Sequence, residues 1–144
     1  MLLIFLFPCI SFAQKIDSVA FKGANKIVIT TNTKSTEGLK IALLALQDNG
    51  FSIELANTEL GILKTEPKTY GTSGVLIVDV TAEENKVTLR TRIRSTMFYG
   101  TELDLGNPKQ LTYEPYTNRK AVRKGYEILD KVAKSMRLPY VYSN

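Results

Sequence analysis

The most regular pattern of chemically useful side chains in the sequence is an arginine at every second position of one stretch. Arg90, Arg92 and Arg94 alternate there with other residues, among them Leu89 and Ile93. In a β-strand successive side chains point to opposite faces, so the three guanidinium groups would share one face. A guanidinium presents its N–H donors in a fork that matches the oxygens of phosphate, sulfate and carboxylate. The spacing therefore predicts a strand with three guanidinium groups on its exposed face, which makes them candidates for binding an anion or a partner.

An ordinary solvated face is the alternative interpretation of these arginines. Asp79 and Glu54 or Glu66 belong to neighbouring predicted strands, so they could pair with the arginines across the sheet. Cross-strand pairs of this kind contribute only about 0.2–1 kcal/mol. A second basic group is open to two interpretations as well, a solvated face or a contact with anionic lipid or glycan; it consists of Arg119, Lys120, Arg123 and Lys124.

Tyrosine supplies the other candidate binding residues. Tyr99, Tyr113 and Tyr116 lie in or beside an irregular segment, and Tyr140 and Tyr142 lie in the last five residues of the sequence. Tyrosine offers a large contact area at low entropic cost and is enriched at interfaces. Tyr99, Tyr113 and Tyr116 are therefore candidates for contact with a ligand or partner. The alternative is that the tyrosines fasten the loop and the tail to the edges of the sheet.

Side chains suited to catalysis are scarce. The sequence has no His, and Cys9 is its one Cys. The absence of His removes the commonest general base, the Ser-His triads and the usual zinc ligand. The stretch 70–74 has two glycines but lacks the Lys-Ser/Thr of a phosphate-binding loop, and the carboxylates at 83–84, 102 and 104 fall in predicted turns or loops. We therefore expect no enzymatic activity, no metal and no cofactor.

The first 13 residues, Met1 to Ala13, are typical of a secretory signal peptide. They carry no charged side chain, and they are too few to cross a bilayer as a helix, which needs about 20 apolar residues. Ser11 and Ala13 are small residues at the −3 and −1 positions of a cleavage site before Gln14. We expect cleavage there, which removes Cys9. The alternatives are an N-terminal core element and a lipidated Cys9.

Charge and compartment are linked in this sequence. The net charge is +5 and the pI is near 9.3, values that would favour a nucleic-acid partner in a cytosolic protein. Export favours two other interpretations of the charge, attraction to anionic envelope surfaces or simply solubility. We expect an exported protein, periplasmic or outer-membrane-associated, with no nucleic-acid partner and no transmembrane segment in the mature chain.

The order of predicted elements indicates an α+β fold. Apolar residues at helical spacing predict a helix over 38–48, which stops at Gly50. A second amphipathic helix is expected from Pro115 to about Arg137, followed by a tail at 140–144. The expected strands are 26–31, 51–56, 62–66, 75–81 and 86–96, and the irregular loop is 98–114.

Short turns between consecutive strands predict an antiparallel meander. Two amphipathic helices then bury their apolar sides by covering the same face of the sheet. We therefore expect a single domain over 14–144, built as an antiparallel sheet of about five strands with two helices packed on one face, in the order β-α-β-β-β-β-α.

This order resembles the TATA-box-binding-protein-like and helix-grip arrangements. The segment 43–67, LLALQDNGFSIELANTELGILKTEP, is similar in pattern to small exported domains of Gram-negative envelope lipoproteins, such as the repeats of the C component of the outer-membrane assembly machine. The resemblance covers roughly 26–95 and rests on the order of helix, glycine stop, strand, turn and strand. It implies a fold and a compartment, and it supplies no functional residues.

Two functions follow from these patterns. The first is an exported, non-catalytic envelope module that binds an envelope protein or an anionic surface polymer. The alternative is a periplasmic carrier, in which the helices and the sheet enclose a small apolar or anionic ligand in a cavity of about 300 Å³ or more.

Overall fold

The computed structural model describes residues 15–70, 74–95, 109–112 and 120–144. The predicted signal peptide, Tyr99, Tyr113, Tyr116 and most of the predicted loop 98–114 lie outside these residues. The described residues form nine strands and two helices. Their bounds are β1 (Ile16–Asp17), β2 (Lys26–Thr30), α1 (Ser35–Asp48), β3 (Ile53–Asn57), β4 (Ile62–Thr65), β5 (Lys68–Tyr70), β6 (Gly74–Glu83), β7 (Lys86–Ser95), β8 (Lys109–Gln110), α2 (Lys120–Ser135) and β9 (Tyr140–Ser143).

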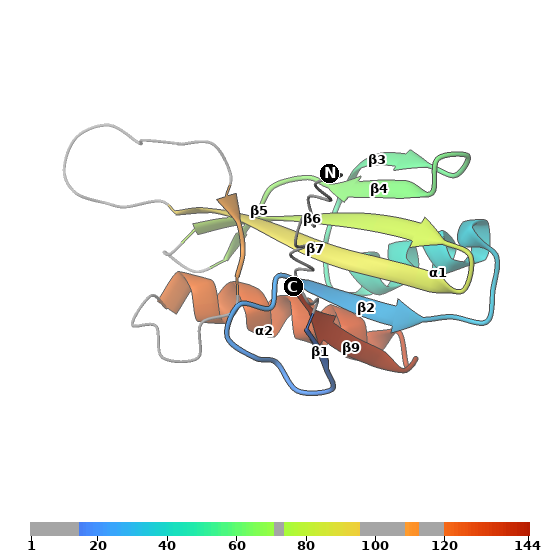
Figure 1. The fold of residues 1–144 in the computed structure, drawn as a ribbon. Coiled ribbons are helices and arrows are strands. Elements are labelled where there is room, and N and C mark those ends of the chain that lie inside the picture. Colours follow the sequence, from blue (N-terminus) through green and yellow to red (C-terminus); the bar gives the residue numbers. More distant parts are fainter. Residues whose placement is uncertain (1–14, 71–73, 96–108, 113–119) are drawn as a thin grey trace, which may run out of the picture.

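The strands pair into one antiparallel sheet in the order β1-β9-β2-β7-β6-β4-β3 (Figure 1). The short strand β5 pairs with β6, and β8 pairs with β7. Every one of these pairings is antiparallel, and β3, β4, β6 and β7 lie side by side in the sheet in that order, although β5 separates β4 from β6 in the chain. The predicted α+β class and antiparallel sheet are therefore confirmed.

The predicted number of strands, about five, is wrong. The five expected strands correspond to β2, β3, β4, β6 and β7, and the structure adds β1, β5, β8 and β9. The added strands have two to four residues each, so an alternation of apolar and polar residues has little length in which to show. The predicted tail is in fact β9, which lies between β1 and β2.

Both helices pack on the same face of the sheet, as predicted (Figure 1). A Cβ atom built on Gly38 of α1 would meet Val87, and one built on Gly125 of α2 would meet Leu76 and Ile93. Strand alternation places these three sheet residues on one face. Between the helices and the sheet lies an apolar core of buried side chains, which include Ile27, Leu46, Leu76, Leu89 and Leu129.

Helix α1 ends where the sequence predicts. Gly50 has φ +74°, the left-handed conformation that commonly follows a helix. Lys68 reaches this end from β5, and its Nζ donates to the carbonyl oxygen of Asn49 at 2.6 Å. The same Nζ lies 4.6 Å from the centroid of the Phe51 ring. A cation is favourable at a helix C-terminus, so Lys68 fastens α1 to the sheet.

Helix α2 and β9 are joined through Asp130. The hydroxyl groups of Tyr140 and Tyr142 donate to Asp130 Oδ1 at 3.2 and 2.5 Å, and Lys134 Nζ lies 2.6 Å from Oδ2. The ring of Tyr142 also stacks on that of Tyr126 of α2, with centroids 6.1 Å apart. Tyr140 and Tyr142 thus fasten the predicted tail to α2 and not to an edge of the sheet. Within the described residues no helix is long and apolar enough to cross a bilayer.

Candidate anion-binding face

The sheet face opposite the helices carries the polar side chains of the central strands, and we call it the helix-free face. Antiparallel pairing sets partner residues side by side on the same face. One row on this face runs across five strands, and its register gives Ser143, Lys26, Arg90, Asp79 and Lys64 in that order. A parallel row two residues away in each strand gives Val141, Val28, Thr88, Thr81 and Ile62.

The predicted arginine strand is β7, and Arg90 and Arg92 fall at alternate positions on its helix-free side. Arg94 pairs with Val75 of β6 in the backbone register, and its side chain lies outside what the structure describes. The structure therefore brings two of the three predicted arginines to one face. Their surroundings divide them into one paired and one unpaired guanidinium.

Arg92 is the paired arginine. Its Nε and Nη2 donate to the two carboxylate oxygens of Asp79 at 2.6 and 2.7 Å, which is the bidentate geometry that suits a guanidinium and a carboxylate. The hydrogen bond to Asp79 raises the pKa of Arg92 above its ordinary value, although burial opposes the shift. For Arg92 the alternative interpretation, a cross-strand ion pair with Asp79, is thus the observed one.

Arg90 is the unpaired arginine. It is exposed, and its neighbours in the row are Asp79 of β6 and Lys26 of β2. Asp79 is bonded to Arg92, and within the described part of the chain no carboxylate forms an ion pair with Arg90 or Lys26. Two positive charges therefore lie directly opposite each other on adjacent strands, an arrangement that destabilises a sheet unless an anion compensates it.

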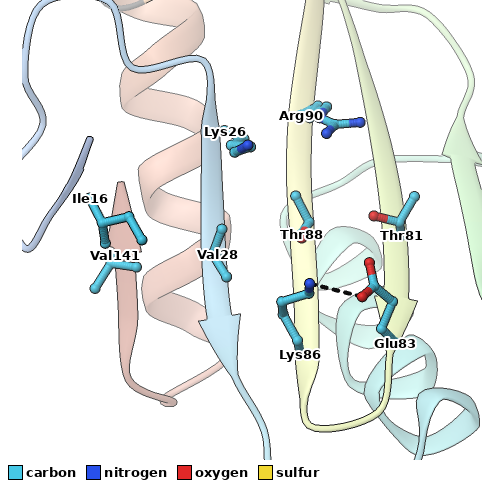
Figure 2. Close-up of a pocket in the computed structure, with 9 residues that line it drawn as sticks. All are labelled: Ile16, Lys26, Val28, Thr81, Glu83, Lys86, Thr88, Arg90 and Val141. Carbon is cyan, nitrogen blue, oxygen red and sulfur yellow. Dashed lines mark ion pairs between the residues drawn. The ribbon is translucent and has the colours of Figure 1, made fainter. Parts of the chain in front are cut away.

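These two cations border an open pocket with a volume of about 360 Å³, which we call the trough (Figure 2). Its floor holds Val28, Thr88 and Thr81 from the middle of β2, β7 and β6. On the far side of this floor, Lys86 pairs with Glu83 at 2.8 Å. The full lining is Ile16, Lys26, Val28, Thr81, Glu83, Lys86, Thr88, Arg90 and Val141.

The trough carries a net positive charge. Three of its lining residues are cations (Lys26, Lys86 and Arg90) and one is an anion (Glu83), which leaves a formal charge of +2. The trough lies on the helix-free face and not between the helices and the sheet, where the predicted carrier would hold its ligand. Among the described residues there is no group of three or more His, Cys, Asp or Glu side chains that could hold a metal.

Sequence reasoning missed Lys26, Lys86 and the two threonines. Arg90 was found because the Arg-x-Arg-x-Arg repeat is visible in one strand, whereas the trough is assembled from side chains on β1, β2, β6, β7 and β9. A usable signal existed in 26–30, where Lys26, Val28 and Thr30 alternate with two isoleucines. Placing Lys26 opposite Arg90 still required the register of β2 on β7.

The second basic group, on α2, is described in part. Arg123 and Lys124 are both exposed, and both lie near Glu127 of the same helix, at 4.0 and 3.4 Å. Exposed pairs at this spacing contribute a few tenths of a kcal/mol. Arg119 and the side chain of Lys120 lie outside the described residues. The described pair fits a solvated helix face.

Comparison with known proteins adds no relative from which a function could be transferred. No protein-family model matches the chain, and the search of curated proteins finds no match. The chemistry of the trough is therefore argued from its own residues.

Proposed function

We propose that this protein is a non-catalytic binding module that holds an anionic group of its partner on the helix-free face of the sheet. The observation that carries the proposal is the pair Lys26 and Arg90, which lie directly opposite each other at the border of the trough and form no ion pair with a carboxylate of the described residues. Like charges across a sheet oppose folding. A pair of like charges that destabilises the fold is expected at a site where a bound ligand supplies the opposite charge.

The lining of the trough supports binding more than catalysis. Apart from its cations it holds aliphatic side chains, two threonines and Glu83, which already pairs with Lys86. A general base needs a free group near the reacting atom. The sequence has no His to serve as one. Cations above a floor of valine and threonine instead suit recognition of a charged group.

Export is part of the proposal. A signal peptide over 1–13 would place the protein in the periplasm or at the outer membrane, where anionic surface polymers and envelope proteins are the available partners. N-terminal sequencing of the protein isolated from the periplasm of a Gram-negative host tests this point. A mature chain that begins at Gln14 is expected. A chain recovered from the cytoplasm with Met1 in place would refute export and leave the binding proposal intact.

A polyanion titration tests the binding function. We expect dextran sulfate to bind the protein with an affinity that falls as salt rises, because ionic contacts are screened. The variant Lys26→Gln/Arg90→Gln should bind at least about tenfold more weakly, the equivalent of one strong charge-assisted contact.

The matched control is Lys131→Gln/Arg123→Gln, which removes two positive charges from exposed positions on α2. It should change the affinity by less than about twofold, since surface charges far from a contact are screened. Equal losses in the two double variants would mean that the polyanion responds to net charge alone, and the proposal would be rejected.

A further inference from the structure

We infer that the group bound at the trough is a phosphate monoester carried on a hydroxyl-bearing body, such as a phosphorylated sugar unit. This inference rests on the proposed function and adds the chemical class of the ligand. It follows from how charge, hydroxyl groups and apolar groups are distributed across the trough.

The charged border selects for a compact dianion. Residues opposite each other in an antiparallel pair have Cα atoms about 4.5–5.5 Å apart, so the side chains of Lys26 and Arg90 leave the sheet as close neighbours. Figure 2 shows them at the same level of β2 and β7. A phosphate monoester carries a charge of about −1.5 to −2 and three acceptor oxygens. It can therefore compensate both cations, whereas a single carboxylate leaves one of the two charges without compensation.

The two cations also offer a phosphate two different kinds of contact. Arg90 offers a planar fork that can bond two oxygens at once, and Lys26 offers a compact point charge with rotatable donors. The Lys26 side chain is half-buried and the Arg90 side chain is exposed. One oxyanion between them would thus accept directional hydrogen bonds from Arg90 and a less directional contact from Lys26.

The floor of the trough suits the rest of the ligand. Thr88 and Thr81 are partners in the register of β7 and β6, and Val28 is the partner of Thr88 on the other side. Each strand residue advances about 3.3 Å, so this row lies about 6.6 Å from Lys26 and Arg90. Two hydroxyl groups beside an apolar surface match a ring that bears both hydroxyl and C–H groups.

The far side of the trough extends this match. The Lys86–Glu83 pair lies one further row away and offers both a donor and an acceptor to ligand hydroxyl groups. Val141 and Ile16 close one end of the trough with apolar surface, and Ile16 is 61 % exposed. A bare inorganic anion would leave all of these groups unused.

Calorimetric titration of the protein with four probes tests the inference: glucose 6-phosphate, inorganic phosphate, glucuronate and glucose. We expect glucose 6-phosphate to bind most tightly and inorganic phosphate more weakly. Glucuronate should bind at least about tenfold more weakly than glucose 6-phosphate, because it lacks the second charge and the third oxygen. Glucose should give no measurable binding.

Two double variants locate the parts of the ligand. Lys26→Gln/Arg90→Gln should abolish the response to both phosphate-bearing probes. Thr81→Val/Thr88→Val keeps the shape of the floor and should weaken glucose 6-phosphate alone, by about tenfold, while inorganic phosphate is unaffected. Thermal unfolding of each variant shows that it is folded before its titration is interpreted.

The outcomes separate this inference from the proposed function. Glucuronate binding as tightly as glucose 6-phosphate would overturn the phosphate class, although the anion-binding function would stand. If Lys26→Gln/Arg90→Gln and Lys131→Gln/Arg123→Gln lose dextran sulfate affinity equally, and none of the four probes binds, both the phosphate class and the anion-binding function are overturned. A phosphate-bearing polysaccharide such as a phosphomannan distinguishes the two sources of the ligand: tighter binding per phosphate than glucose 6-phosphate supports a polymer, and equal binding supports a small molecule.

Discussion

Arg92 donates hydrogen bonds to both carboxylate oxygens of Asp79, with N···O distances of 2.6 and 2.7 Å. Asp79 is the direct register partner of Arg90, not of Arg92. The carboxylate therefore pairs along a diagonal of the sheet, and Arg90, directly opposite it, forms no ion pair among the described residues. The Asp79–Arg92 pair thus sets the charge of the trough without belonging to it, which makes Arg92 a positioning residue.

Substitution of Arg92 by leucine should weaken anion binding at a trough that Arg92 does not line. The change releases Asp79, which then compensates Arg90 across the strand pair. We expect an affinity for dextran sulfate or glucose 6-phosphate that is about tenfold lower in a calorimetric titration.

The double variant Arg92→Leu/Asp79→Asn distinguishes positioning from direct contact. If Arg92 acts only by holding Asp79, removal of the carboxylate restores the binding that the single variant loses. If Arg92 itself touches the ligand, the double variant stays as weak as the single one. The second result would contradict the role assigned to Arg92.

Substitution of Asp130 by alanine should destabilise the contact between α2 and β9. It removes the acceptor of the Tyr140 and Tyr142 hydroxyl groups and the partner of Lys134. We expect the free energy of unfolding to fall by about 2–3 kcal/mol in urea denaturation, since the buried Tyr142 keeps its desolvation cost without its bond. Asp48→Ala, at the exposed end of α1, should cost less than about 0.5 kcal/mol. Equal effects of the two substitutions would refute this account.

The same cluster predicts how stability depends on pH. Burial alone would raise the pKa of Asp130, but hydrogen bonds from Lys134 and Tyr142 outweigh burial and lower it below its ordinary 3.8. The unfolded chain therefore takes up this proton first as the pH falls below about 4, and the stability contributed by the folded carboxylate is lost in that range. The difference in unfolding free energy between the wild-type protein and Asp130→Ala should shrink below about pH 4.

At alkaline pH the stability of the fold depends on Tyr142, whose pKa is raised and not lowered. Burial and the hydrogen bond to Asp130 raise the pKa of Tyr142 well above its ordinary 10.0. The unfolded chain loses this proton at a lower pH than the folded protein, so stability falls as the pH rises above about 10. Tyr142→Phe should reduce this alkaline loss in urea denaturation. An unchanged alkaline slope would show that Tyr142 is not the group responsible.

Substitution of Thr65 by valine should loosen the junction between β4 and β6. The Thr65 hydroxyl accepts a hydrogen bond from the Val78 amide at 2.9 Å, and both residues are fully buried. Valine has nearly the same shape but leaves the buried N–H without an acceptor, at a cost of about 1–3 kcal/mol. Thr30→Val, at an exposed position of β2, is the control and should cost less than about 0.5 kcal/mol. A stability of Thr65→Val equal to that of the control would contradict this bond's importance.

Substitution of Lys68 by methionine should release the C-terminal end of α1 from the sheet. The change keeps the aliphatic stem but removes the bond to the Asn49 carbonyl and the contact with the Phe51 ring. We expect a loss of about 1–2 kcal/mol in thermal unfolding. Faster hydrogen exchange should appear in the last turn of α1. The exposed Lys40→Met serves as the control, and similar behaviour of the two variants would rule out a capping role.

The elements that follow from local sequence patterns were predictable. Helix α1 has apolar residues at helical spacing and stops before Gly50, and β7 carries Val87, Leu89 and Ile93 on one face and Arg90 and Arg92 on the other. The short strands were not predictable, because they have two to four residues each and because β1, β8 and β9 pair with segments distant in the chain. Strand β9 is the clearest case: Tyr140–Ser143 reads as a polar and aromatic tail until β1 and β2 are placed on either side of it.

The candidate site divides in the same way. The shared face of Arg90 and Arg92 follows from strand periodicity alone. Whether each arginine is compensated depends on register, since Asp79 could serve either of them. Lys26 enters the site only through the pairing of β2 with β7, and no pattern within 26–30 identifies its partner.

The position of β9 constrains the order in which the sheet can form during synthesis. Strand β2 gains one neighbour from β7 and the other from β9, which is synthesised after both helices and all the remaining strands. An emerging chain therefore keeps one edge of β2 open until β9 has been synthesised, and the trough, which needs Val141, is completed only then.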